Sequence, residues 1–172
     1  MAGSLIKIDE EIVSSAVASV TLGGSDWDNS YAVYMVKMNN VTRDSGNGHI
    51  LLRVTASGTP DTSANYDRAR KQLRADTTFG NSTATNETFT YVGQSIAPTT
   101  NYETNIIMYL YNFNNSNEYC FGTIEESAYR GFLIANQGGW VHTVAQSCDG
   151  VQFFSESGNI ASGTFTLYGL KK

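Results

Sequence analysis

The stretch SGNIASGTFTLYGL, residues 157–170, decides the fold of this chain. Its Gly-Asn pair at 158–159 suits a turn that requires positive φ, because glycine lacks a Cβ and asparagine tolerates the left-handed region. Phe165, Leu167 and Gly169 then face one way, and the intervening threonines and tyrosine face the other. This pattern predicts a half-buried strand that inserts into a sheet and closes a β-sandwich, with Gly169 where two backbones approach closely.

The composition agrees with an all-β fold. The 172 residues fit one domain, and 16 glycines, only 2 prolines, 10 tyrosines and 8 phenylalanines are typical of many short strands joined by tight turns. Segments rich in β-branched and aromatic residues recur at spacings of about 8 to 12 residues between turn signals. We therefore predict an antiparallel β-sandwich or jelly-roll-like fold with about ten short strands and at most one short helix.

Several local patterns give more specific expectations. Residues 31–38 and 49–55 are expected to pair as a hairpin through the Asn/Gly-rich turn between them. Residues 65–75 have weak helical periodicity, which leaves open one or two helical turns or an extended crossover. Residues 77–86 are predicted to be a polar loop, because Ser, Thr and Asn dominate them.

The strongest predicted strand covers residues 105–113. Tyr109 and Tyr111 share a face with Ile107 and Phe113 if the alternation continues to the end of the segment. Such a face is explained by burial in the core or at a subunit interface, and the alternative is that the tyrosine rings stack on sugars.

The amino-terminal segment, residues 1–11, is predicted to be an arm, and residues 12–172 a single β-sandwich domain. Leu5, Ile6 and Ile8 are its apolar residues and precede an acidic tripeptide. We expect these three side chains to dock the arm, either on its own domain or on a neighbouring subunit. Deletion of residues 1–11 is expected to leave a folded domain with weakened docking.

Charge excludes some partners. Charged residues are 16% of the chain and the net charge is −5, whereas nucleic acid is bound mainly through clustered Lys and Arg. There is no apolar run of the length that spans a bilayer, and the first residues do not have the pattern of a secretory signal. We expect synthesis in the cytoplasm, where Cys120 and Cys148 stay reduced and behave as small buried apolar residues.

No motif of an enzyme or a metal site is found. His49 and His142 have no ligand-type neighbours at metal-site spacing, so ordinary hydrogen bonds are expected. Asp26 and Asp28 flank Trp27, and this is the only carboxylate pair beside an aromatic residue that could serve a glycosidase or a Ca²⁺ ion. Turn capping by the two aspartates and packing of Trp27 on the core are the simpler explanations. We predict no catalytic, cofactor-binding or metal-binding residues.

The segment from Ser157 to Lys171 resembles a signature ending of small virion structural proteins of tailed bacteriophages, notably cyanophages and their relatives. Further stretches are similar to the same family: YAVY at residues 31–34, NNV at 39–41, LLRV at 51–54, YNFNN at 111–115 and EY at 118–119. The match is one of pattern and extends over most of the chain.

The resemblance implies a virion protein that is assembled in the cytoplasm of a host bacterium. A capsid cement, or decoration, protein would be a compact sandwich, often a homotrimer, that bridges subunits of the major capsid protein. A tail fibre or receptor-binding head that contacts a host glycan is the alternative, followed by a carbohydrate-active enzyme. The cement role is favoured because the sequence has no coiled-coil heptads or collagen-like repeat that would form a fibre shaft.

Overall fold

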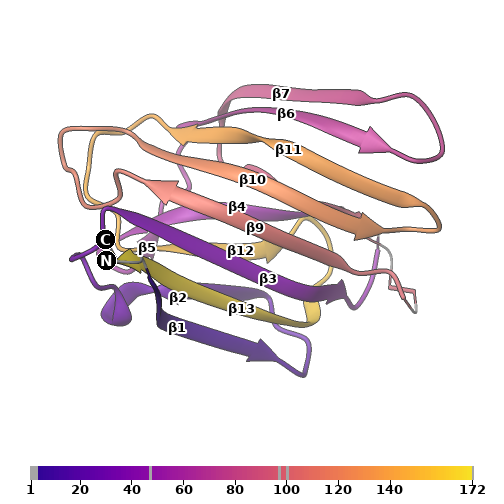
Figure 1. Ribbon diagram of the computed structural model, residues 1–172, viewed down its shortest axis with the longest axis horizontal. Coiled ribbons are helices and arrows are strands. Elements are labelled where there is room, and N and C mark those ends of the chain that lie inside the picture. Colours follow the sequence, from indigo (N-terminus) through magenta and orange to yellow (C-terminus); the bar gives the residue numbers. More distant parts are fainter. Residues whose placement is uncertain (1–3, 47, 97, 100, 172) are drawn as a thin grey trace.

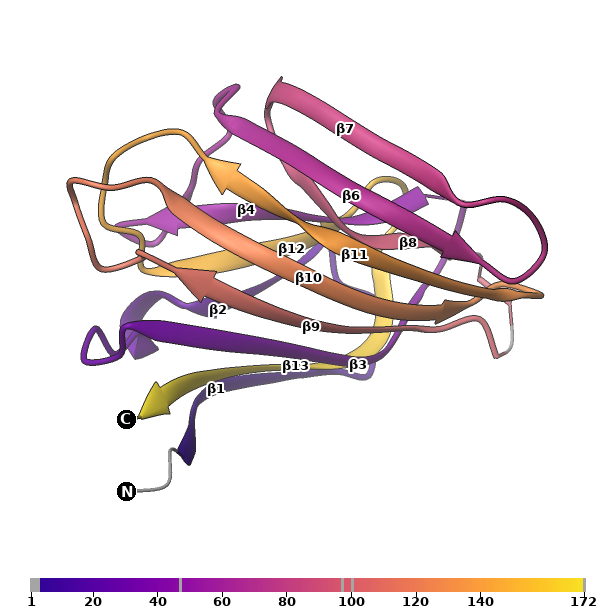
Figure 2. The same ribbon diagram turned by 45° about the horizontal axis from the view of Figure 1, so that its top comes forward.

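The computed structural model describes residues 4–46, 48–96, 98–99 and 101–171. Two antiparallel sheets pack face to face, and the smaller sheet lies behind the larger one in Figure 1, while its strands β4 and β12 pass behind β10 and β11 in Figure 2. The predicted all-β sandwich is confirmed, with thirteen strands in the described residues. The helical content of these residues is a three-residue 3-10 turn, Gly24–Asp26, and no described helix is long and apolar enough to cross a membrane.

The larger sheet contains eight strands. In spatial order they are β1 (Ser4–Val13), β13 (Ile160–Lys171), β3 (Val33–Arg43), β9 (Thr104–Tyr111), β10 (Cys120–Tyr129), β11 (Leu133–His142), β6 (Tyr66–Arg74) and β7 (Gly80–Glu87). The smaller sheet contains β2 (Ser19–Gly23), β12 (Gly150–Ser155), β4 (Gly48–Ala56) and β5 (Thr59–Pro60) in that order, and β8 (Thr90–Ile96) also pairs with β4.

The last strand, β13, inserts between β1 and β3 and pairs antiparallel with both, as predicted. Phe165 and Leu167 are fully buried, and the Phe165 ring lies 5.7 Å from that of Phe153 on β12 of the smaller sheet. The role expected for Gly169 is different in the structure. A Cβ on this residue would collide with the ring of Tyr31, so Gly169 makes room for an aromatic side chain and not for a second backbone.

The turn before β13 is bound to the turn after β3 by Arg43, whose side chain is buried. Its guanidinium donates hydrogen bonds to the Gly48 carbonyl at 2.6 Å, to the Ser157 carbonyl and to Ser157 Oγ at 2.6 Å. The Asn159 amide donates to Asp44 Oδ1 at 2.8 Å. These bonds hold together two connections that cross between the sheets, from β3 to β4 and from β12 to β13.

The predicted hairpin between residues 31–38 and 49–55 is wrong. In the structure β3 lies in the larger sheet and β4 in the smaller one. The edges of β3 are taken by β13 and β9, and those of β4 by β12 and by β5 with β8. Both strands contribute apolar residues to the same core, but from different sheets.

The stretch with weak helical periodicity is also extended. It forms β6, which pairs with β11 and β7, and two of its arginines lie against one aromatic ring. The guanidinium carbons of Arg68 and Arg70 lie 4.1 and 5.3 Å from the ring centre of Tyr91 on β8. The predicted polar loop at 77–86 contains most of β7, a sheet-edge strand whose polar side chains remain in solvent.

The predicted arm is part of the larger sheet. Residues 4–13 form β1, which pairs with β13 along its length, so the expected boundary after residue 11 falls inside a strand. Leu5 and Ile6 are 50% and 39% exposed, and Ile8 packs against the core. Deleting residues 1–11 would therefore remove most of a strand and expose the edge of β13.

The position of β13 gives a direct stability test. Leu167→Asp should lower the free energy of unfolding by about 4 kcal/mol or more, because it places an unpaired carboxylate in the core. Ser127→Asp, at an exposed position of β10, is the matched control and should change it little. Urea unfolding of both purified variants measures the difference. A Leu167→Asp protein as stable as the control would show that β13 is not a closing element.

Candidate binding face

The outer face of the larger sheet is unusually apolar at β9. Alternation along this strand sends Ile106, Met108 and Leu110 into the core and turns Ile107 and Tyr109 outward, where they are 40% and 37% exposed. The interpretation of these outward residues as core is therefore wrong. They lie on the uncovered side of the sheet.

Phe113 does not share this face, contrary to the expected alternation. The strand ends at Tyr111, and Asn112 has a φ of 64°, which redirects the chain. Phe113 is consequently buried, 1% exposed, and its ring stacks 5.5 Å from that of Trp27. The apolar outer face thus ends with β9, and the aromatic residue after it belongs to the core.

Exposed apolar residues gather on this outer face. Seven large ones point outward from the larger sheet: Leu5, Ile12, Ile107, Tyr109, Phe121, Tyr129 and Leu133. No exposed residue of this kind is found on β2, β4, β5 or β12 of the smaller sheet. The two outer faces therefore differ in chemistry, and the outer face of the larger sheet is the candidate binding face.

A shallow groove of about 710 Å³ crosses this face. Tyr111 and Phe121, paired neighbours on β9 and β10, line one part of it. Asp67 on β6 and Thr85 on β7 line another part, and Gly139 on β11 adds no side chain between them. The volume is within the range of small-ligand sites, about 300 to 1,000 Å³.

A buried tryptophan supports the groove from the core side. Trp140 on β11 is 3% exposed and also lines the groove. It pairs with Gly122 on β10, where a Cβ would collide with the indole ring. The missing side chain of Gly122 lets the indole lie flat against β10.

The loop with Asp26, Trp27 and Asp28 has a structural role. The Trp27 ring lies 4.0 Å from that of Tyr34 and packs against the core, as expected. Asp28 Oδ1 accepts a hydrogen bond of 2.9 Å from the Ser30 amide, so it caps a turn, and hydrogen bonding with Ser30 lowers the pKa of Asp28. Neither aspartate lines the groove.

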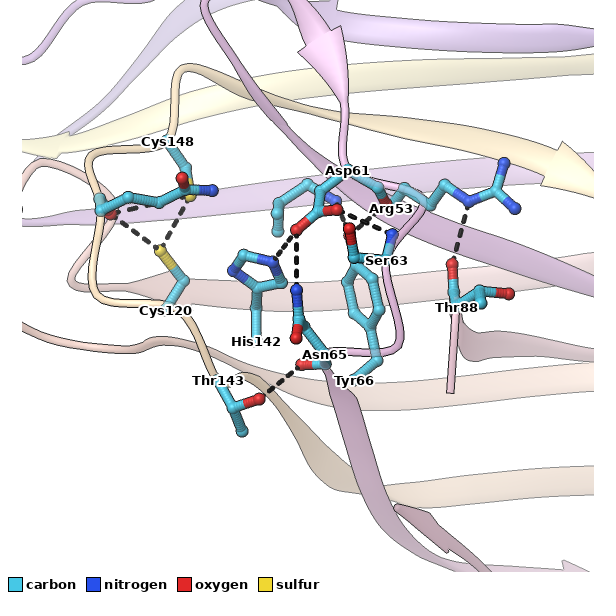
Figure 3. Close-up of polar contacts among 12 residues, drawn as sticks. Arg53, Asp61, Ser63, Asn65, Tyr66, Thr88, Cys120, His142, Thr143 and Cys148 are labelled. Atoms are coloured by element: carbon cyan, nitrogen blue, oxygen red, sulfur yellow. Dashed lines mark hydrogen bonds and ion pairs between the residues drawn. The ribbon is translucent and has the colours of Figure 1, made fainter. Parts of the chain in front are cut away.

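Chemically reactive residues meet in the core, although no motif spacing in the sequence indicates this contact (Figure 3). His142 Nε2 lies 2.7 Å from Asp61 Oδ2, and the sulfurs of Cys120 and Cys148 are 3.1 Å apart. An aspartate, a histidine and a cysteine in this order can activate a nucleophile. Here the hydrogen bond with Cys120, together with burial, raises the pKa of Cys148, so its thiol stays protonated at neutral pH.

Both cysteines are buried and free, as expected, but they are in contact with each other. His142 is fully buried as well, which keeps substrates from the cluster. Asp61 is 81 residues from His142 along the chain, so only the fold brings it to the pair of His142 and Cys148. The cluster is therefore a packed polar network and not an open catalytic site.

The histidines do not come together at a metal site. His49 Nδ1 lies 2.9 Å from Glu156 Oε2 and its ring stacks on Tyr91, whereas His142 contacts Asp61. Within the described parts of the chain, no group of three or more His, Cys, Asp or Glu residues is placed to hold a metal ion.

Comparison with models of known protein families, with curated proteins and with solved structures finds no match to this chain.

The two histidines should titrate on opposite sides of the ordinary histidine pKa, about 6.5. Burial lowers the pKa of His142, but its polar contacts, among them the Asp61 carboxylate 2.7 Å from Nε2, outweigh burial and raise the pKa overall. Burial lowers the pKa of His49 more than the Glu156 contact raises it. An NMR titration of the imidazole signals measures both pKa values. The signal that disappears in His49→Asn should be the one with the lower pKa.

The shift of His142 has a defined effect on stability. A raised pKa in the folded state adds stability that is complete below about pH 6.5 and is lost as the pH rises through the folded pKa. Wild-type protein should lose this contribution over that range, and His142→Gln should lack it. A His142 signal that titrates below pH 6.5 would contradict the hydrogen-bonded pair with Asp61.

Proposed function

We propose that this protein is a structural component of a tailed-bacteriophage virion that binds other virion proteins through the outer face of its larger sheet. The observation that carries the proposal is the gathering of seven exposed apolar side chains on that face. Soluble monomers rarely leave large contiguous apolar patches uncovered, and such patches mark interaction sites. The virion assignment is supported by the resemblance of residues 157–171 and the other quoted segments to phage structural proteins.

Within the virion, the proposed role is that of a capsid cement protein that bridges subunits of the major capsid protein. A broad sheet face with aromatic residues and few charges suits wide contacts of this kind. Many copies, each weakly held, stabilise a shell together because their attachments act in parallel. The low content of charged residues, 16%, fits contacts that depend on tyrosine, phenylalanine and polar uncharged groups.

The edge strand β1 supports self-association into a homo-oligomer, in this proposal a trimer. Leu5, Ile6 and Ile12 on this strand are 50%, 39% and 68% exposed. An uncovered strand edge offers unpaired backbone groups to a neighbouring copy. Leu5 and Ile6 thus keep their proposed docking role as residues of a sheet edge, while Ile8 is held by its own core.

Substitution of the binding face tests the cement role. Ile107→Arg should weaken binding to purified capsids about 30-fold, about 2 kcal/mol, because it places a charge at the centre of the contact. Thr21→Arg, at an exposed position on β2 of the smaller sheet, should bind as wild type. Occupancy on capsids after titration with each variant measures the effect. Equal occupancy for the two variants would exclude the face as the contact.

A second candidate function, glycan binding by a receptor-binding head, is favoured by the groove. Sugars stack on aromatic faces, and Tyr111 and Phe121 offer two rings. The carboxylate of Asp67 and the hydroxyl of Thr85 could accept and donate hydrogen bonds to sugar hydroxyls.

Purified protein separates the two candidates. A receptor-binding head should bind host-surface glycans, and the purified protein should block infection by the phage. Phe121→Ala should abolish the glycan binding. Phe79→Ala is the control, because Phe79 is 60% exposed but does not line the groove. A cement protein should bind capsids and show neither retention nor blocking.

A further inference from the structure

We propose that Cys120 and Cys148 form a dithiol site that oxidises to a disulfide joining the two sheets. Their sulfurs are 3.1 Å apart, and a disulfide bond requires about 2.05 Å. Closing the bond therefore needs a movement of about 1 Å, which side-chain rotation and small backbone adjustment can supply. This inference does not depend on the function proposed above.

The backbone fixes both cysteines from different parts of the fold (Figure 3). Cys120 begins β10 in the larger sheet and pairs with His142. Cys148 precedes β12 of the smaller sheet, and its amide donates to the Phe113 carbonyl at 2.7 Å. Because each residue is held by backbone bonds, the short separation of the sulfurs is a property of how the sheets pack.

The pair also favours one reactive thiolate. Hydrogen bonding with Cys148 lowers the pKa of Cys120, while the same contact, with burial, raises that of Cys148. One sulfur can thus lose its proton more readily while its neighbour donates to it. The thiolate is the form of cysteine that reacts with oxidants.

A small pocket reaches one cysteine of the pair. Cys148 lines a cavity of about 250 Å³ together with Trp27, Asn114 and Asp149. Cys148 is 2% exposed, so only a small oxidant is expected to reach the sulfurs in the folded protein. Hydrogen peroxide is an oxidant of suitable size.

The reaction with peroxide balances in two steps. A thiolate of the pair attacks one peroxide oxygen, the O–O bond breaks, and hydroxide leaves and takes up a proton, which gives a sulfenic acid and water. The second sulfur then attacks the sulfenic sulfur, its proton is released, and the displaced hydroxide leaves as water. Two thiols and one peroxide thus give one disulfide and two waters, with two electrons passing from sulfur to oxygen.

Oxidation would stabilise the folded protein by a covalent cross-link after the protein leaves a reducing compartment. Thiols stay reduced in the cytoplasm, and disulfides persist outside it. The bond would close the loop from residue 120 to residue 148, which spans β10 and β11 and links the two sheets. From the loop-closure model and the usual dependence of Tm on stability, the oxidised protein should melt about 10 °C higher.

The experiment uses the full chain, reduced, desalted and treated with hydrogen peroxide in native buffer. We expect both titratable thiols to disappear, the intact mass to fall by two hydrogens, peptide mapping to link residues 120 and 148, and Tm to rise until a dithiol reductant reverses it. Cys120→Ser and Cys148→Ser should each gain oxygen instead, without a rise in Tm.

Three results would overturn the proposal: two thiols that persist in native protein, a bond that forms only in urea, or a cross-link between chains. If either serine variant fails to fold, oxidation and reduction of the wild-type protein, followed by mass and Tm, still decide the outcome. None of these measurements depends on binding to capsids or glycans. A negative result for the disulfide would therefore not contradict the proposed function.

Discussion

A two-layer sandwich can bury only one face of each sheet, and the functional account depends on this constraint. Strand β9 is apolar on both faces, but the smaller sheet covers only the face with Ile106, Met108 and Leu110. Ile107 and Tyr109 are left on the open side without a layer of this chain above them. Burial of apolar area is the main source of binding free energy, so this side is where association would gain most.

The interior shows the opposite distribution near β6. Arg70 and Glu126 are 7% and 5% exposed, and Asn136 is fully buried. Glu126 accepts hydrogen bonds from Thr104 at 2.6 Å and from Asn136 at 2.5 Å, so part of the larger sheet carries polar groups inside and apolar groups outside. The core behind the apolar outer face is therefore not uniformly apolar.

The sequence predicted the fold class because period-two alternation and turn residues are local signals, as Phe165 and Leu167 illustrate. Local signals do not show which sheet a strand joins, so the Asn/Gly-rich turn after Arg43 predicts a hairpin although the chain crosses between the sheets there. Alternation around Tyr109 distinguishes the two faces of the strand. It does not show which of these faces the second sheet covers. Predicting the groove and the contact between Cys120 and Cys148 requires the register of strands that are distant in the sequence. Local sequence patterns do not determine that register.

An image reconstruction of the virion tests the central claim most directly, because it locates the protein and shows which surface is covered. The account predicts many copies on the capsid, with the outer face of the larger sheet, centred on Ile107, Tyr109 and Phe121, packed against a neighbouring virion protein. A reconstruction in which that face is open to solvent, or in which the protein is absent from the particle, would contradict it.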